Sequence, residues 1–310
     1  MNIKEQILFM LSTASEEVSG QVMSQRLGVS RVAIWKQIQS LKKNGYDISS
    51  SAKGYRLLWV PDDPFSWEIS LSNWNIRYFQ EVKSTMDVAR IVASQNCPDR
   101  TVIVAKKQTQ GRGRLERTWA SDEGGLFFTL VLRPDEPAVF SFRFNFVVSL
   151  AVVATLAEYG IEARPKWPND IWVGDQKICG IISEMQTQGE MPLYVAVGVG
   201  VNVNNQLFEV LPKAVSIAQL LGKTVSRKEI LQTILKHIDS YLAKEPKEIM
   251  DKWRSIMLFL GTPVQVKTLQ ETIHGIALDV DDMGALRVRL PSGEEKRIFY
   301  GDCFSDSFQL

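Results

Sequence analysis

The sequence predicts an α+β protein with three parts: an N-terminal winged helix-turn-helix, a central mixed sheet with helices on one face, and a C-terminal SH3-like β-barrel. Three observations lead to this prediction. Residues 1–60 repeat apolar side chains at helical spacing, residues 65–260 combine strand-like runs with long helical patterns, and residues 261–310 alternate over short strands. A chain of 310 residues is long enough to bury a core in each part.

The charge is unevenly distributed along the chain. The net charge is +1, but residues 1–60 carry eight basic and four acidic side chains, which gives this segment +4 and leaves −3 for the rest. A small basic segment joined to a slightly acidic remainder is typical of a separate nucleic-acid-binding module.

Cysteine and histidine are scarce, which limits the chemistry that we expect. Cys97, Cys179 and Cys303 lie far apart without metal-ligand spacing, and indicate the reduced thiols of a cytoplasmic protein. With two histidines in the chain, we expect neither a histidine-based metal site nor a Ser/His/Asp triad. The charged N-terminus is unlike a signal peptide, and apolar runs such as residues 146–157 are too short to cross a bilayer, so we expect no membrane contact.

The basic segment predicts three helices in the order of a helix-turn-helix. Apolar residues recur at helical spacing between residues 3 and 11, and a short helix follows at residues 21–27. Gly28 makes a tight turn, and Ser30 can cap a third helix at residues 31–44. The apolar stripe of this third helix consists of Ile34, Ile38 and Leu41.

The opposite face of the third helix predicts contacts with operator DNA. Ser30 and Arg31 lie at the end that would enter the major groove, and Lys36 and Gln39 follow along the same face. The alternative is a three-helix interaction module that binds no DNA. The local positive charge favours DNA.

Two further features accompany this face. Residues 46–48 and 54–57 read as short strands around a polar tip and predict a wing, which typically adds phosphate contacts. Val32 and Trp35 fall near the exposed side, which is unusual for apolar residues. Two interpretations of this pair stay open: contact with thymine methyl groups, or packing on a neighbouring element.

Residues 60–64 contain two prolines and predict a linker to the middle part. Beyond it the pattern predicts two long helices, at residues 141–159 and 226–259. It also predicts strands at residues 101–105, 126–132, 171–173, 178–185 and 193–203, of which the third and fourth form a hairpin.

A loop rich in arginine and glycine follows the first of these strands. Arg112, Arg114 and Arg117 lie within residues 111–119, where two glycines permit close approach of the backbone to a ligand. Guanidinium groups suit phosphate and carboxylate oxygens, and Trp119 offers a flat ring for a base. The loop therefore predicts an anion site, against the alternative of a solvated charged loop.

Two other glycine-containing segments are not nucleotide-binding motifs. The end of a phosphate-binding loop is suggested at residues 222–224, but Ile217 stands where such a loop needs glycine. Gly198 and Gly200 lack the third glycine of a dinucleotide fingerprint and lie in a strand. They suggest instead that a ligand approaches the sheet closely.

The last fifty residues predict a small barrel. Apolar and polar side chains alternate over four short strands, at residues 263–266, 275–280, 285–290 and 296–300. We expect this part mainly to give structural support.

Four sequence blocks together resemble the biotin–protein ligase family. They are the arginine loop, Lys-Trp-Pro-Asn-Asp at residues 166–170, residues 177–184, and Gly-Val-Gly-Val-Asn at residues 198–202, in this order. The N-terminal segment resembles that of the bifunctional members, which are both ligase and biotin-operon repressor. The resemblance covers essentially the whole chain and implies a catalytic domain of the biotin/lipoate ligase type at residues 65–260, between a DNA-binding domain at residues 1–60 and an SH3-like domain at residues 261–310.

The resemblance implies a two-step reaction. The family joins the carboxylate of biotin to the α-phosphate of ATP, releases pyrophosphate, and passes biotin from biotinyl-5′-adenylate to a lysine of the biotin carboxyl carrier protein of acetyl-CoA carboxylase. It also implies a repressor with the adenylate as corepressor, and a homodimer when the adenylate is bound. Because two anions must meet, cations are needed where negative charge builds up.

The family's residue roles transfer onto matching positions of this chain. The catalytic residues implied are Lys177, Arg112, Arg114 and Asp170, with Lys177 bridging the carboxylate and the α-phosphate. Biotin contacts are implied for Ser84, Thr85, Gln108, Gly111, Arg112, Arg114, Lys177, Ile182, Gly198 and Gly200. ATP contacts are implied for Arg114, Arg117, Trp119, Lys166, Asn169 and Asn202. Asp170 and Asn202 have the oxygen donors that suit Mg²⁺ beside substrate phosphates.

Two departures from the family pattern keep alternatives open. Met86 follows Ser84 and Thr85 where the family commonly has asparagine, which removes one polar contact near biotin. Leu115 and Glu116 stand where other members can have Arg-Gly, and the extra carboxylate predicts weaker retention of the adenylate. The alternatives are a biotin-sensing transcription factor without ligase activity, and a related lipoate ligase.

Single residues of the site also have ordinary interpretations. Asp170 could cap a turn, Lys177 could be a solvated turn lysine, and Trp119 could be a core residue. The combination of blocks favours the functional interpretation of each.

Overall fold

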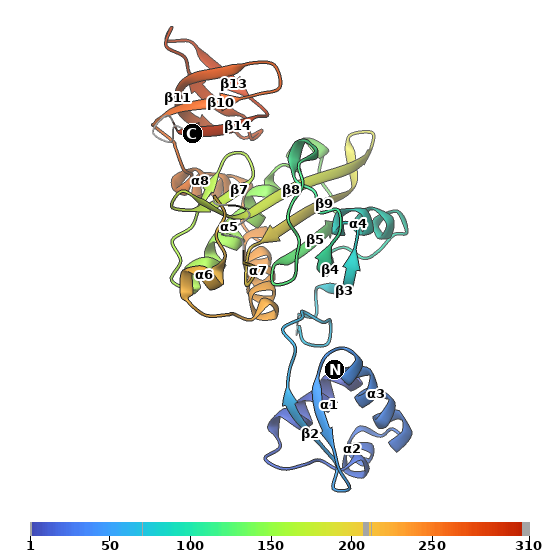
Figure 1. The fold of residues 1–310 in the computed structure, drawn as a ribbon. Coiled ribbons are helices and arrows are strands. Elements are labelled where there is room, and N and C mark those ends of the chain that lie inside the picture. The colour runs from blue at the N-terminus through green and yellow to red at the C-terminus, as the bar shows by residue number, and fades with distance from the viewer. Residues whose placement is uncertain (1, 70, 207–210, 212, 306–310) are drawn as a thin grey trace. The chain divides into compact units, whose positions relative to one another are not determined.

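The computed structural model describes residues 2–69, 71–206, 211 and 213–305, apart from the side chain of residue 116. It divides into two compact units, Met1–Ser70 and Leu71–Leu310 (Figure 1). The first contains the basic segment, and the second contains the predicted middle and C-terminal parts.

The N-terminal unit has three helices and a two-stranded wing, as predicted. Gly28 ends the second helix with a φ of 65°, the left-handed value that favours glycine. Ser30 Oγ accepts the backbone N–H of Ala33 at 3.1 Å and so starts the third helix, whose predicted apolar stripe is fully buried. The elements are α1 (Ile3–Thr13), α2 (Gly20–Leu27), α3 (Arg31–Lys43), β1 (Asp47–Ser50) and β2 (Tyr55–Trp59).

Residues 60–64, where a linker was predicted, contain no helix or strand, and the residues that follow them pack within the N-terminal unit. Phe65 is buried, and its ring stacks on that of Tyr46 with 6.0 Å between centroids. Trp67 stacks on Phe65 and donates from Nε1 to Tyr46 Oη at 2.9 Å. These aromatic contacts hold Phe65 and Trp67 in the N-terminal unit, because the burial of large rings is favourable.

A seven-stranded mixed sheet forms the centre of the second unit. Its order is β3-β4-β5-β9-β8-β7-β6, with β3 and β4 parallel and the other neighbours antiparallel. The strands are β3 (Asn75–Val82), β4 (Thr101–Gln108), β5 (Leu126–Leu132), β6 (Arg164–Lys166), β7 (Asp170–Val173), β8 (Gln176–Gln188) and β9 (Met191–Val201). The five predicted strands are confirmed, whereas β3 and β6 were not predicted.

Helices cover both faces of this sheet, so the prediction of helices on one face is wrong. On β8 and β9, Ile182 pairs with Gly198 and Ser183 with Val197, and successive residues point to opposite faces. Met86 of α4 lies beside Gly198, whereas Asn145 of α5 donates to Ser183 Oγ at 3.0 Å. The helices are α4 (Thr85–Ser94), α5 (Arg143–Glu158), α6 (Ile217–Leu221), α7 (Arg227–Leu242) and α8 (Pro246–Ile256). The last two replace the single helical segment predicted there.

One stretch of the second unit is long and apolar enough to cross a membrane by length and composition alone. It is Ala138–Glu158, which contains α5, and it is longer than the apolar run considered from the sequence. However, 61% of its most apolar window is buried inside the fold. This is the burial expected of a helix in a hydrophobic core.

The C-terminal part is a five-stranded antiparallel sheet, in the order β13-β12-β11-β10-β14, and we call it the C-terminal sheet domain. Its strands are β10 (Pro263–Lys267), β11 (Thr272–Val280), β12 (Leu286–Arg289), β13 (Glu295–Ile298) and β14 (Asp302–Ser305). The four predicted strands are confirmed. The fifth, β14, was not predicted.

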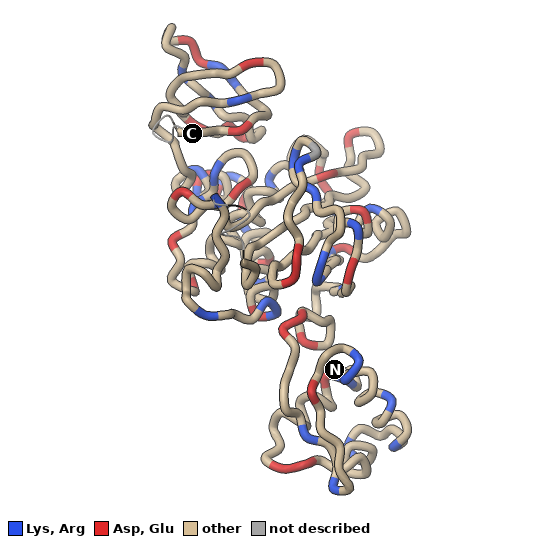
Figure 2. Tube along the Cα trace, in the orientation of Figure 1, with Lys and Arg blue, Asp and Glu red and all other residues tan. Residues whose placement is uncertain are grey.

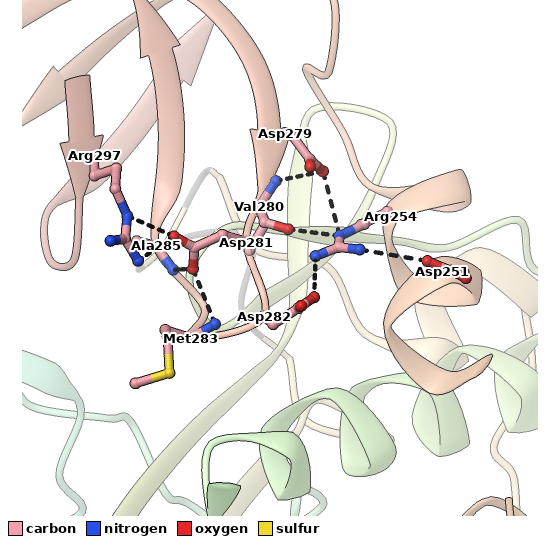
Figure 3. Close-up of polar contacts among 9 residues, drawn as sticks. All are labelled: Asp251, Arg254, Asp279, Val280, Asp281, Asp282, Met283, Ala285 and Arg297. Atoms are coloured by element: carbon pink, nitrogen blue, oxygen red, sulfur yellow. Dashed lines mark hydrogen bonds and ion pairs between the residues drawn. The ribbon is translucent and has the colours of Figure 1, made fainter. Parts of the chain in front are cut away.

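Arg254 of α8 holds the C-terminal sheet domain to the central domain (Figure 3). Its Nε donates to the carbonyl oxygen of Val280 at 2.5 Å and lies 3.3 Å from Asp279 Oδ1. Its Nη2 donates to Asp282 Oδ1 at 2.8 Å. The guanidinium also contacts Asp251 of its own helix, and its contacts with two carboxylates and a carbonyl of the C-terminal sheet domain fix both the position and the direction of the turn after β11.

Candidate active site and DNA-binding face

A cavity of about 130 Å³ opens on the face of the central sheet that carries α4. It is bounded by the start of α4, the arginine loop, the β7–β8 hairpin and the glycines of β9. Most of the residues that the family resemblance implicates line it. The exceptions are Gly111, Lys166 and Asn202.

One end of the cavity has a hydrogen-bonded set of hydroxyl and amide groups. Gln108 Oε1 accepts from the backbone N–H and the hydroxyl of Thr85, at 2.8 and 3.0 Å. Thr129 Oγ1 donates to Thr85 Oγ1 at 2.8 Å, and Gln108 Nε2 donates to Ser121 Oγ at 2.9 Å. Ser84 caps α4 by accepting from the N–H of Met86. Thr129 and Ser121 were not predicted from the sequence. No local motif marks them, and it is the pairing of strands that brings them to this set of groups.

Met86 and Gly198 form an apolar wall beside this set. Met86 is buried in the cluster of α4 and the sheet, and it also lines the cavity. A Cβ atom on Gly198 would lie 2.7 Å from Met86 Sδ, closer than real contacts allow. A larger residue at position 198 would therefore force the Met86 side chain to move, and the expected loss of a polar contact becomes a gain of apolar surface.

The three arginines of the loop have separate partners. Arg112 Nη2 donates to Asp87 at 2.8 Å, and Arg114 Nη1 donates to Asn169 Oδ1 and to the carbonyl oxygen of Gly301, both at 3.2 Å. Arg117 pairs with Asp302 of the C-terminal sheet domain. Burial lowers the pKa of Arg114, whereas the hydrogen bond that Arg117 donates to Asp302 raises the pKa of Arg117. All three arginines line the cavity.

Backbone contacts give the loop the form of a short hairpin. Arg112 and Thr118 form a β-bridge, and Trp119 N donates to the carbonyl oxygen of Gly111 at 2.9 Å. A Cβ atom on Gly111 would lie 2.3 Å from Ser121 Oγ, so this glycine is needed for the fold of the loop. The side chain of Glu116, where weaker adenylate retention was predicted, lies outside the described residues.

Trp119 lies directly on the glycines of the sheet. A Cβ atom on Gly200 would lie 2.4 Å from Trp119 Nε1, and one on Gly180 would lie 2.8 Å from Cζ3. Lys177 Nζ lies 5.0 Å from the centroid of the indole ring, within range of a cation–π contact. Trp119 is half-buried and lines the cavity, so it is not an ordinary core residue.

Lys177 and Asp170 form an ion pair inside the cavity. Lys177 Nζ lies 2.7 Å from Asp170 Oδ1, and both side chains are mostly covered, with 28% and 21% of their area exposed. The hairpin of β7 and β8 brings them together. Neither residue fits its ordinary interpretation, because Lys177 is not a freely solvated lysine and Asp170 points to a cation.

Lys166, at the end of β6, and Asn169, in the turn between β6 and β7, lie beside the site. Asn169 Nδ2 donates to the carbonyl oxygen of Ile181 at 2.7 Å. Lys166 is buried, with Nζ 3.8 Å from the centroid of Trp172 and 5.0 Å from that of Phe304. Burial lowers the pKa of Lys166, which the nearby Asp170 carboxylate partly opposes.

Asn202 belongs to a second cavity on the other side of Trp119. This cavity has a volume of about 450 Å³, and Lys177, Lys213 and Ala214 also line it. Asn202 Oδ1 accepts from Asn205 Nδ2 at 3.1 Å. Trp119 and Lys177 line both cavities, so the two cavities are adjacent and together form the candidate site. Among the described residues, no group of three or more His, Cys, Asp or Glu side chains could hold a metal.

The N-terminal unit exposes the predicted DNA-binding residues. Ser30, Arg31, Lys36 and Gln39 are all exposed on α3. Arg31 lines a groove of about 650 Å³ between α3 and the wing. Basic residues lie along α3 and at the tip of the wing (Figure 2).

Comparison with known proteins finds relatives along most of the chain. Three family models match: the HTH domain at residues 4–56, the Biotin/lipoate A/B protein ligase family at residues 78–202, and the Biotin protein ligase C terminal domain at residues 259–305. The bifunctional ligase/repressor BirA of Bacillus spizizenii is 36% identical over 94% of this chain and 95% of its own length. The biotin–[acetyl-CoA-carboxylase] ligase of Paracoccus denitrificans is 32% identical over 64% of this chain and 90% of its own.

A solved structure has the same central fold. The biotin protein ligase from Aquifex aeolicus in complex with biotin and ATP has a TM-score of 0.63 and 32% identity, and the match covers 74% of this chain and 97% of that one. Sequence blocks, site geometry and overall similarity thus agree. The chain belongs to the family of bifunctional ligase/repressor proteins, with a biotin protein ligase domain that follows a helix-turn-helix domain.

Proposed function

We propose that this protein activates biotin with ATP and transfers it to a lysine of the biotin carboxyl carrier protein of acetyl-CoA carboxylase. The observation that carries this proposal is the placement of Lys177 and Trp119 between the two cavities. One cavity ends in the hydroxyl and amide groups of Thr85 and Gln108, and the other is large enough for a nucleotide base. The reacting groups would meet beside Lys177.

The first step forms a mixed anhydride. A carboxylate oxygen of biotin attacks the α-phosphorus of ATP, and the bond to pyrophosphate breaks. Negative charge builds up on the phosphoryl oxygens, where Lys177, Arg112 and Arg114 stabilise it. In the second step the carrier lysine attacks the carbonyl carbon, AMP leaves, and the new amide loses a proton.

Biotin is held by the polar end and the glycine floor of the first cavity. Ser84, Thr85 and Gln108 supply hydrogen bonds to its ureido group. Ile182, Gly198 and Gly200 shape the pocket, and Gly111 fixes the loop that covers it.

ATP is held on the side of the site that the arginine loop forms. Trp119 packs on adenine in the second cavity, Arg117 contacts phosphates, and Lys166, Asn169 and Asn202 support them. Asp170 and Asn202 are the proposed oxygen ligands of Mg²⁺, which neutralises phosphate charge when bound. Asp170 fits this role best, because Asn202 Oδ1 already accepts from Asn205.

The N-terminal unit makes the protein a repressor of biotin synthesis in the cytoplasm, where ATP and DNA are present. The adenylate acts as corepressor: it orders the arginine loop and favours a homodimer, which presents two copies of α3 to a palindromic operator. Ser30, Arg31, Lys36 and Gln39 contact the DNA.

Transfer of labelled biotin to a carrier domain with Mg-ATP tests the enzyme. We expect labelling by the parent, a loss of about 10²- to 10³-fold in Lys177→Ala, and no change in Lys223→Ala, an exposed lysine outside both cavities. Biotin binding without labelling would instead identify a sensor-repressor. Labelling with lipoate in preference to biotin would identify a lipoate ligase.

A further inference from the structure

An apolar pair lies on the surface of the predicted DNA-binding helix. Val32 and Trp35 are three residues apart on α3, and 61% and 53% of their areas are exposed. The other apolar face of the same helix is fully buried, so these two residues are not needed for the core of the unit. Large apolar side chains left exposed on a folded unit indicate an interaction surface.

Cations surround this pair. Arg31 and Lys36 are its neighbours on α3, and Lys53 of the wing lies across the groove that Val32 and Trp35 line. Within the described part of the chain, none of these three cations forms an ion pair, whereas most arginines near the candidate active site do. The surface therefore fits a partner with negative charge at its edges and apolar groups between them.

Double-stranded DNA has this combination in its major groove. Phosphates line both edges, and the methyl group of thymine is the one apolar group that a base pair presents there. The first turns of a recognition helix are the part that reaches base edges. Val32 and Trp35 occupy these turns of α3.

We infer that Val32 and Trp35 read thymine methyl groups in the operator, while Arg31, Lys36 and Lys53 contact phosphates. This inference rests on the repressor part of the proposed function. The inference predicts that the operator carries thymine at defined positions of each half-site, and that the protein recognises each of these thymines through its methyl group alone.

The test uses the full-length protein with biotin and Mg-ATP. Duplexes are first selected from a random pool, and each thymine of the selected sequence is then replaced by deoxyuridine, which lacks only the methyl group. The parent should lose about fourfold in affinity at each methyl that is read, as expected for burial of one such group. Val32→Ala and Trp35→Ala should bind the thymine duplex more weakly, and each should lose the discrimination at its own positions.

Phe9→Ala is the matched control. Phe9 is equally exposed, at 61%, but lies on α1. It should keep the full preference for thymine over deoxyuridine. All these variants should transfer biotin at the parent's rate.

The outcomes separate the two proposals. Selection of a sequence by the parent with no effect of deoxyuridine at any position would overturn methyl reading and leave the repressor intact. Unchanged discrimination in both variants would also overturn it, and would point to packing on another part of the protein. Failure to enrich any duplex would remove the repressor function itself.

Discussion

Lys177 Nζ lies 2.7 Å from Asp170 Oδ1 and 5.0 Å from the ring centroid of Trp119. One cation thus contacts both a carboxylate and an aromatic ring at the junction of two cavities. Since its distance to Asp170 is that of a strong charge-assisted hydrogen bond, the position of Lys177 depends on Asp170.

Asp170→Asn should impair activation of biotin more than transfer. The substitution keeps the shape but removes the negative charge that holds Lys177, and it replaces one of the two carboxylate oxygens that suit Mg²⁺ by an amide nitrogen. We expect ATP–pyrophosphate exchange to fall by about 10²-fold, while transfer from supplied biotinyl-adenylate falls less. Equal losses in both steps would contradict a role tied to the metal and phosphates.

Gly200→Ala should displace Trp119. The new methyl group would lie 2.4 Å from Nε1, so the indole must move. We expect a loss of about 1–3 kcal/mol in the free energy of unfolding in urea, together with weaker ATP binding. In a Trp119→Ala background the same change should cost almost nothing in stability, because the clash is gone. An undiminished cost there would assign the strain to another contact.

Asp302→Asn should loosen the arginine loop. The pair with Arg117 is partly exposed, since 61% of the arginine side chain is accessible, so it contributes no more than about 1 kcal/mol. We expect faster tryptic cleavage after the loop arginines and a rise of up to about fivefold in the KM for ATP. Glu294→Gln, an exposed change in the same domain, is the control. Identical cleavage in both variants would refute the contact.

Lys166 should make stability depend on alkaline pH. Burial lowers its pKa below the ordinary 10.5, so the folded state releases the proton at lower pH than the unfolded state does. Folding is then disfavoured at neutral pH by the buried charge, and this cost disappears as pH rises from the lowered pKa towards 10.5. The stability of the parent relative to Lys166→Met should therefore increase over this range in thermal unfolding. A constant difference would show that the folded and unfolded pKa values are equal.

Arg31→Ala should weaken operator binding without affecting ligation. Loss of one phosphate contact should reduce the slope of log affinity against log salt by about one unit. Affinity measured by fluorescence anisotropy at several salt concentrations gives this slope. A parent-like slope would mean that Arg31 does not contact a phosphate.

Local pattern predicted most of the elements of the fold, and the family resemblance indicated the residues of the candidate site. The capping of α3 by Ser30 and the strand that leads into the arginine loop follow from neighbouring residues, and these were correct. The position of α4 on the opposite face, the hydroxyl of Thr129 and the contact of Arg117 with Asp302 depend on strand order and on residues far apart in sequence. Periodicity contains no information on such pairings. The stacking of Phe65 on Tyr46 likewise depends on residues far apart in sequence.

The division of the chain has a consequence for how such proteins can be recombined. All the lining residues of both cavities lie in Leu71–Leu310, and the C-terminal sheet domain contributes Gly301 and Asp302 to the arginine loop. A different N-terminal unit could therefore be grafted at residue 70 to place other genes under biotin control. The C-terminal sheet domain offers no such freedom, because exchanging it would remove partners of the catalytic loop.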